Sequence, residues 1–138
     1  MDAKITQVTL VVKNQVEALE FYTTKLGFTK NMEFSYPNGT RWVTVGPRGQ
    51  DMQLALWQAG WPDATGISSS WRAGQGAPIV LNVDDCRGAC EELKSKAVEF
   101  RQEAHEMPYG VVAFFSDPDG NLFEILQSPD TMGRRGQP

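Results

Sequence analysis

Few side chains in this sequence are candidates for acid-base chemistry or ligand binding, and the strongest candidate is a single carboxylate in an apolar stretch. Glu124 is the one charged residue in the strand-like stretch Leu122–Gln127. A carboxylate among apolar neighbours can act as a general acid or base, or it can orient a bound molecule. Amides recur in other strand-like runs, at Gln7, Gln53 and Asn82, and neutral amides position ligands and stabilise developing charge. The pattern favours an orienting role for Glu124 over catalysis, with a purely structural role as the remaining alternative.

The histidine and the cysteines are weaker candidates. His105 is the only histidine and precedes a turn at Met107–Gly110, so we expect it at the surface or at the mouth of a binding site, where its charge would depend on pH. Cys86 and Cys90 are four residues apart in a helical stretch. A disulfide there would close a trivially short loop, and nothing nearby resembles a base that would activate a thiolate. We interpret both as reduced thiols of a cytosolic protein.

Composition and charge argue against several classes of partner. The chain has 138 residues, of which 41% are hydrophobic and 22% charged, as in an ordinary globular domain. Its formal net charge is −4, and no stretch gathers lysine and arginine, which argues against nucleic acid as a partner. No apolar run is long enough to span a membrane, and the first residues lack the order of a secretion signal. We therefore expect a cytoplasmic protein.

The elements that must position these side chains come in two copies. At an offset of 71 residues, the turn Pro47–Gln50 matches Pro118–Asn121, and the strand-like run Val8–Val12 matches Ile79–Val83. A single offset through turns and strands indicates an internal duplication.

Each copy predicts a strand, a helix and three further strands. The first helix follows Asn14, which with Glu17 has the form of a capping box, and Gly27 is placed to end it. The predicted strands are 5–12, 28–36, 41–45, 52–57, 79–83, 99–106, 111–116 and 122–127, and the second helix is 86–97. We predict an α+β fold in which two tandem β-α-β-β-β units form an eight-stranded, half-open cup.

The units are predicted to share one domain, 1–138, with repeats at about 4–58 and 78–127. A glycine- and serine-rich linker, 59–77, joins them, and a loose tail follows at 128–138. Trp61 and Trp71 in the linker either pin it to the core, close over a cavity, or pack against a partner subunit.

Strand alternation separates the side chains that a helix would cover from those facing the cup. In the first strand Val8, Leu10 and Val12 form the apolar face. An aromatic wall with a few amides suits a flat, partly apolar small molecule. The candidate ligand-binding residues are Gln7, Thr9, Gln53, Trp57, Asn82 and Glu124.

Several stretches together resemble the vicinal-oxygen-chelate superfamily of glyoxalases, bleomycin-resistance proteins and extradiol dioxygenases. They are the strand Gln7–Val12, the helical Ala18–Tyr22 with Lys25–Phe28, the strand Arg41–Pro47, the turn Met107–Gly110 and the turn Ser116–Asn121 followed by Glu124. The resemblance implies the cup fold. It does not select one function, because that superfamily supports many chemistries on one fold.

The resemblance also implies four metal-ligand positions, which carry over as Gln7, Gln53, Pro78 and Glu124. Gln53 is an amide where the family usually has glutamate, and Pro78 has no side-chain donor. None of the four is histidine or cysteine, so the strongest ligands for zinc or iron are missing. We expect no cofactor and no tightly held metal. A weakly held divalent ion at Gln7, Gln53 and Glu124 is the alternative.

The predicted function is that of a glyoxalase/bleomycin-resistance-type protein that binds a small, partly apolar molecule in the cup, as a homodimer. The alternative is an enzyme, namely a divalent-metal-dependent, glyoxalase-like lyase or isomerase or a ring-cleaving dioxygenase, with Glu124 as its catalytic residue.

Overall fold

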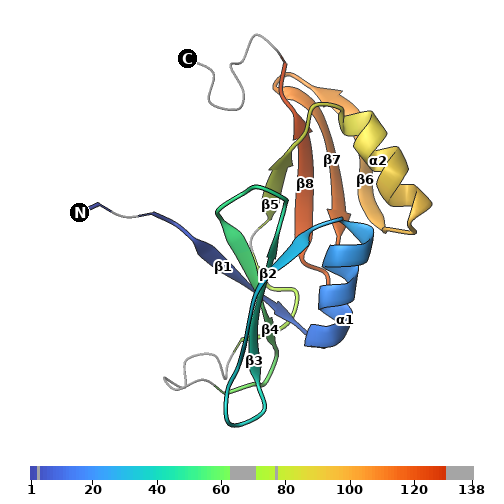
Figure 1. Ribbon diagram of the computed structural model, residues 1–138. Helices are drawn as coiled ribbons and strands as arrows, with labels where there is room; N and C mark the ends of the chain where they lie inside the picture. Colours follow the sequence, from blue (N-terminus) through green and yellow to red (C-terminus); the bar gives the residue numbers. More distant parts are fainter. Residues whose placement is uncertain (3, 63–70, 77, 130–138) are drawn as a thin grey trace. The chain divides into compact units, whose positions relative to one another are not determined.

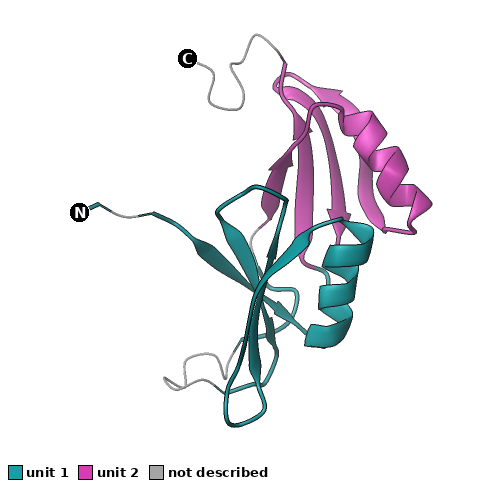
Figure 2. Cartoon of the chain, in the orientation of Figure 1, with its two compact units in different colours: residues 1–76, 118–120 teal, residues 77–117, 121–138 magenta. Residues whose placement is uncertain are grey.

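The computed structural model describes residues 1–2, 4–62, 71–76 and 78–129. The chain divides into two compact units, residues 1–76 with 118–120 and residues 77–117 with 121–138 (Figure 2). Much of the predicted linker (63–70 and 77) and nearly all of the predicted tail (130–138) lie outside the described residues.

Unit 1 has the predicted order of elements (Figure 1). Its described elements are β1 (Gln7–Val12), α1 (Gln15–Glu20), the π-helical turn η1 (Phe21–Lys25), β2 (Thr29–Ser35), β3 (Arg41–Gly46) and β4 (Gln53–Gln58). The sheet has the strand order β1-β4-β3-β2, with β1 parallel to β4 and the other neighbours antiparallel. The parallel pair forms because a helix and two strands separate β1 from β4 in the chain.

Unit 2 repeats this plan. Its described elements are β5 (Ile79–Asn82), α2 (Cys86–Ser95), β6 (Phe100–Met107), β7 (Gly110–Ser116) and β8 (Leu122–Gln127). The sheet order is β5-β8-β7-β6, again with one parallel pair, β5 with β8. The fold is therefore α+β and consists of two β-α-β-β-β units, as predicted. Within the part of the chain that is described, no helix is long and apolar enough to cross a membrane.

Local sequence explains where the two helices begin. The side chain of Asn14 accepts a hydrogen bond from the Glu17 amide at 3.0 Å, and that of Asp85 accepts one from the Gly88 amide at 3.0 Å. Such caps satisfy amides at the first turn that have no partner within the helix. The cap predicted at Asn14 is confirmed.

A glutamine at the end of the last strand attaches each helix to its sheet. The Gln58 side chain accepts a hydrogen bond from the Gln15 amide at 2.9 Å, and the Gln127 side chain accepts one from the Cys86 amide at 2.9 Å. The two helix positions are 71 residues apart, whereas the two glutamines are 69 apart. The predicted metal-ligand positions Gln53 and Glu124 are 71 residues apart, so matching them across the last strands is wrong by two residues.

The two extra residues in unit 1 have identifiable places. One lies in the helix, where η1 widens the last turn: left-handed backbone follows at Gly27 (φ 72°) in unit 1 and at Ala97 (φ 63°) in unit 2, 70 positions apart. The other lies in the β3–β4 connection, which has one residue more than the β7–β8 connection. Neither change alters the strand order.

Each unit buries an apolar layer between its helix and one face of its sheet. In unit 2, Phe115 and Phe123 stack with ring centroids 5.1 Å apart. Burying such side chains supplies most of the stabilisation of a fold of this kind. Core residues of unit 1 include Leu10, Val12, Ala18, Tyr22, Val43, Val45, Leu54 and Leu56, and those of unit 2 include Cys86, Cys90, Ala113, Phe115, Phe123 and Ile125.

Candidate functional site

The unit 1 sheet presents most of the predicted ligand residues on the face opposite α1. The Gln58 side chain points toward α1, so alternation along β4 places Gln53, Ala55 and Trp57 on the other side. Residues paired across strands share a face, and Gln7 pairs with Gln53 and Thr9 with Ala55. The structure thus brings Gln7, Thr9, Gln53 and Trp57 together on one face, here termed the open face of unit 1.

Aromatic rings occupy one end of the open face. Trp57 is 3% exposed and lies at the centre of a group of rings, with centroids 5.8 Å from Trp42, 6.4 Å from Tyr36 and 5.3 Å from Trp61. The Trp57 indole nitrogen donates to the backbone carbonyl of Trp61 at 3.2 Å. Phe34 extends the group by packing on Tyr36 at 5.0 Å. We call Phe34, Tyr36, Trp42, Trp57 and Trp61 the aromatic cluster.

The rings that are exposed in the aromatic cluster are not the ring that was predicted to contact a ligand. Trp57 was the ring predicted to meet a ligand, yet it is buried beneath its neighbours, whereas Phe34 is 56% and Tyr36 38% exposed. Met32, on the same strand, is 43% exposed. Sequence reasoning missed Phe34. Its pairing with Trp42 across β2 and β3 places it on the open face, but this pairing depends on a bulge near Lys30–Met32.

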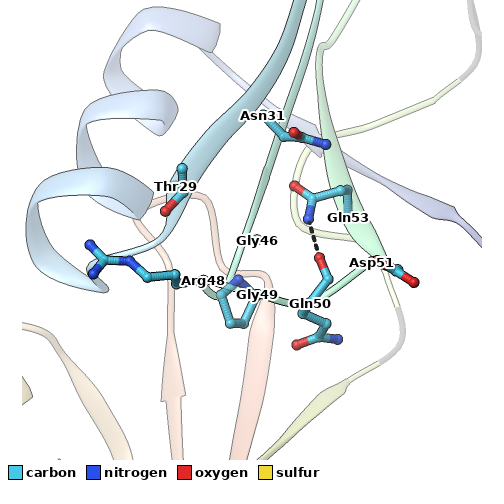
Figure 3. A pocket seen from close by; sticks show the side chains of 9 residues that line it. Thr29, Asn31, Gly46, Arg48, Gly49, Gln50, Asp51 and Gln53 are labelled. Atoms are coloured by element: carbon cyan, nitrogen blue, oxygen red, sulfur yellow. Dashed lines mark hydrogen bonds between the residues drawn. The ribbon is translucent and has the colours of Figure 1, made fainter.

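Polar groups occupy the other end of the open face. The Trp42 indole nitrogen donates to Gln7 Oε1 at 3.1 Å, which fixes that amide. Gln53 is 7% exposed, and its Nε2 donates to the Gln50 carbonyl at 2.9 Å. Gln53 lines an open pocket of about 330 Å³ beside the β3–β4 turn (Figure 3).

The unit 2 sheet has a corresponding open face that holds the remaining candidates. Glu124 pairs with Val80 on β5 and with Phe114 on β7, so the carboxylate lies in an apolar row. Asn82 pairs with Leu126 in the next row. His105 also reaches this face, since it pairs with Val112, and its Nδ1 lies 2.8 Å from the Glu103 carbonyl oxygen.

Register in the two units changes the set of donors implied for a metal. Gln53 and Glu124 are not equivalent: when the two glutamines that hold the helices are matched, Glu124 corresponds to Ala55 and Gln53 to Leu122. The equivalent pairs on the last strands are then Ala55 with Glu124 and Gln53 with Leu122, and each pair has only one side chain with a donor atom, while Pro78 has none. Gln7 Oε1 is already bonded to Trp42. Within the described residues, no three histidine, cysteine, aspartate or glutamate side chains gather. This donor set does not fit a tightly bound transition metal.

The cysteine thiols face the core of unit 2. The Cys86 Sγ lies 3.8 Å from the Ile125 carbonyl oxygen, and Cys90 is 3% exposed. Burial raises the pKa of both thiols, that of Cys90 to about 12. Thiols of this kind are poor nucleophiles near neutral pH.

Comparisons with known proteins agree with this architecture. The family model of the Glyoxalase/Bleomycin resistance protein/Dioxygenase superfamily matches residues 4–125. The uncharacterized protein YetH of Bacillus subtilis is 32% identical over 92% of this chain and 100% of its own length. The lactoylglutathione lyase of Escherichia coli O157:H7 is 27% identical over 82% of this chain and 84% of its own.

Solved structures extend the comparison to the fold. The crystal structure of TnmS3, an antibiotic binding protein from Streptomyces sp. CB03234, has a TM-score of 0.77 and 28% identity, covering 93% of this chain and 98% of that one. A superfamily member from Sphaerobacter thermophilus has a TM-score of 0.78 and 32% identity, covering 92% and 98%. The chain belongs to the glyoxalase/bleomycin resistance protein/dioxygenase superfamily.

Proposed function

We propose that this protein binds a small, partly apolar molecule on the open face of unit 1, without a tightly held metal ion. The observation that carries this proposal is the aromatic cluster, whose outer rings are exposed on a sheet face away from the helix. Exposed rings on a rigid sheet form a flat apolar surface, which suits stacking against a planar ligand. TnmS3, an antibiotic binding protein of the same fold, supports a binding function.

Each candidate residue has a place in this proposal. Phe34, Tyr36 and Trp42 contact the flat part of the ligand, while Trp57 supports them from beneath. Gln7 and Thr9 contribute polar groups on the same face. Asn82 and Glu124 lie on the open face of unit 2, where they form a separate set of polar groups able to hydrogen-bond a ligand.

Fluorescence tests the proposal directly, because three of the cluster's rings are tryptophans. N-pentyl dansylamide, a flat fluorophore with an apolar chain, accepts excitation energy from nearby indoles. We expect saturable energy transfer in the unmodified protein. Phe34→Ser should weaken binding roughly fourfold to twentyfold, because a ligand covers the exposed half of this ring and full burial of such a side chain contributes about 1.5–3 kcal/mol.

Val16→Ser is the matched control, since Val16 is 62% exposed but lies on α1. Unchanged affinity in this variant, together with weaker binding in Phe34→Ser, would locate the probe on the open face. Equal losses in Val16→Ser and Phe34→Ser, or no energy transfer at all, would contradict the proposal.

The rival function is a divalent-metal-dependent lyase, isomerase or dioxygenase, with Glu124 as its catalytic carboxylate. The similarity to lactoylglutathione lyases favours it, whereas the donor set described above does not. Elemental analysis and thermal melting with Mg²⁺, Ca²⁺, Mn²⁺, Ni²⁺ and Zn²⁺ separate the two functions. An ion at a hundredfold excess over its Kd stabilises a folded protein by about 2.7 kcal/mol. Stabilisation of this size that Glu124→Ala and Gln7→Ala abolish would contradict binding without a metal ion, and assays for lyase, isomerase and dioxygenase activity would then test the rival function.

A further inference from the structure

The pocket beside the β3–β4 turn lies at the polar end of the open face (Figure 3). Its walls come from the start of β2, the end of β3, the turn itself and the start of β4. The pocket measures about 330 Å³, enough for a small polar group together with water. Thr29, Asn31 and Gln53 contribute uncharged polar side chains to its lining.

Gln53 contains a polar atom with no partner. The residue is 7% exposed, and its Oε1 is buried and makes no hydrogen bond within the described structure. The amide cannot simply exchange its two ends, because Nε2 donates to the Gln50 carbonyl at 2.9 Å and an oxygen there would face another oxygen. A buried acceptor without a partner costs about 1–3 kcal/mol. The fold therefore maintains an unsatisfied acceptor at the pocket.

The direction of that acceptor indicates what it could bind. In Figure 3 the Gln53 amide oxygen turns toward the side lined by Asn31 and Thr29, while the Arg48 side chain extends away from it. A carbonyl oxygen only accepts hydrogen bonds, so its partner must be a donor. Thr29 and Asn31 add two further groups able to accept. A pocket lined by several oxygens able to accept suits an ammonium group, which carries three donors.

We propose that the ligand carries a primary amine that donates to Gln53 Oε1 while its planar part stacks on the aromatic cluster. This inference rests on the proposed function, since it uses the same open face. Gly46 lines the pocket and lies four residues from Trp42 on β3, which separates the two subsites by roughly 13 Å. The ligand class is thus a planar aromatic compound with an amine on an arm of about this length.

Three probes with one fluorophore test this class. Dansylcadaverine carries a terminal primary amine, N-pentyl dansylamide lacks it, and the trimethylammonium derivative of dansylcadaverine keeps the charge without N–H donors. We expect dansylcadaverine to bind roughly tenfold to a hundredfold more tightly than the other two, as for a hydrogen bond to a charged group. This comparison uses the unmodified protein, so it does not depend on any variant folding.

Gln53→Met assigns the preference to the pocket. It removes the acceptor at similar size and leaves the net charge unchanged, so we expect equal affinity for all three probes. Thr29→Val, on the exposed rim, should reduce the preference partially and serves if Gln53→Met melts early.

The outcomes separate the two proposals. Equal binding of the three probes by the unmodified protein would overturn the amine subsite and leave the aromatic surface intact. A preference that survives in Gln53→Met would also overturn it. No binding of any probe would count against the proposed function itself.

Discussion

Gly46 and Gln53 form a contact whose energy can be predicted in sign as well as size. Gly46 lies at the end of β3, and a methyl group built on it would approach Gln53 Nε2 to 2.6 Å and Cδ to 2.9 Å. The Gln53 amide thus fills the space where other residues carry a Cβ. Gly46→Ala must push this amide away and break its bond to the Gln50 carbonyl.

Two opposing effects determine the outcome of Gly46→Ala. Alanine in a strand is favoured over glycine by about 0.5–1 kcal/mol, because the unfolded glycine chain is more flexible. The flexible Gln53 side chain can move away from the new methyl group, but losing the hydrogen bond to the Gln50 carbonyl leaves buried polar atoms without a partner, which costs about 1–3 kcal/mol and outweighs that gain. We therefore expect a net destabilisation of about 1–2 kcal/mol. In a Gln53→Ala background the obstacle is gone, and the same substitution should stabilise by about 0.5–1 kcal/mol.

A double-mutant cycle by urea denaturation measures this change of sign. It compares the unmodified protein with Gly46→Ala, Gln53→Ala and the double variant, and we expect a coupling energy of about 2 kcal/mol. Melting should follow, with a fall of roughly 3–6 °C for Gly46→Ala alone. The same sign of effect in both backgrounds would refute the proposed contact. Because the displaced amide also carries Oε1, Gly46→Ala should weaken dansylcadaverine binding more than N-pentyl dansylamide binding.

Three further predictions concern the rest of the chain. Ala97 has a φ of 63°, a conformation that suits glycine, so Ala97→Gly should raise the free energy of unfolding by up to about 1 kcal/mol in urea denaturation. Gly27 has a φ of 72°, so Gly27→Ala should lower the free energy of unfolding. Opposite results would contradict the left-handed backbone at these two positions. Burial raises the pKa of Cys90 from 9.0 to about 12, so the folded state retains the proton longer. The free energy of unfolding should therefore be unaffected by this thiol below about pH 9 and should fall as the pH rises toward about 12. The same decline in a Cys90→Ser variant would exclude the Cys90 thiol as its cause. Light scattering at micromolar concentration should show a dimer, and a monomer alone would disprove the dimer predicted from the sequence.

Local patterns were sufficient to predict the elements. Alternation and turn residues located the strands to within about two residues, and Asn14 marked the start of α1 because its side chain caps the next turn whatever the rest of the chain does. The duplication was visible for the same reason, since both copies retain the same turns and strand patterns. The open faces followed from strand parity alone, which is why Gln7, Thr9, Gln53 and Trp57 were grouped correctly.

Long-range packing decided what those patterns left open. The π-helical turn η1 and the longer β3–β4 connection shift the last strand by two residues, so only the register shows that Glu124 matches Ala55 instead of Gln53. The sequence also could not predict which aromatic rings are exposed, because Trp57 is buried by rings from other parts of the chain while Phe34 is not.

The sequence by itself determined the superfamily, the α+β class, the order of elements and the parity of each strand, since these depend on short-range preferences and on repetition. Tertiary structure alone decided which ring is exposed, which amide is bonded and which is not. Gln7 and Gln53 look alike in sequence, yet one accepts a bond from Trp42 and the other retains a buried oxygen without a partner in the described structure. That difference arises from neighbours 35 residues away in one case and from the space above a glycine in the other.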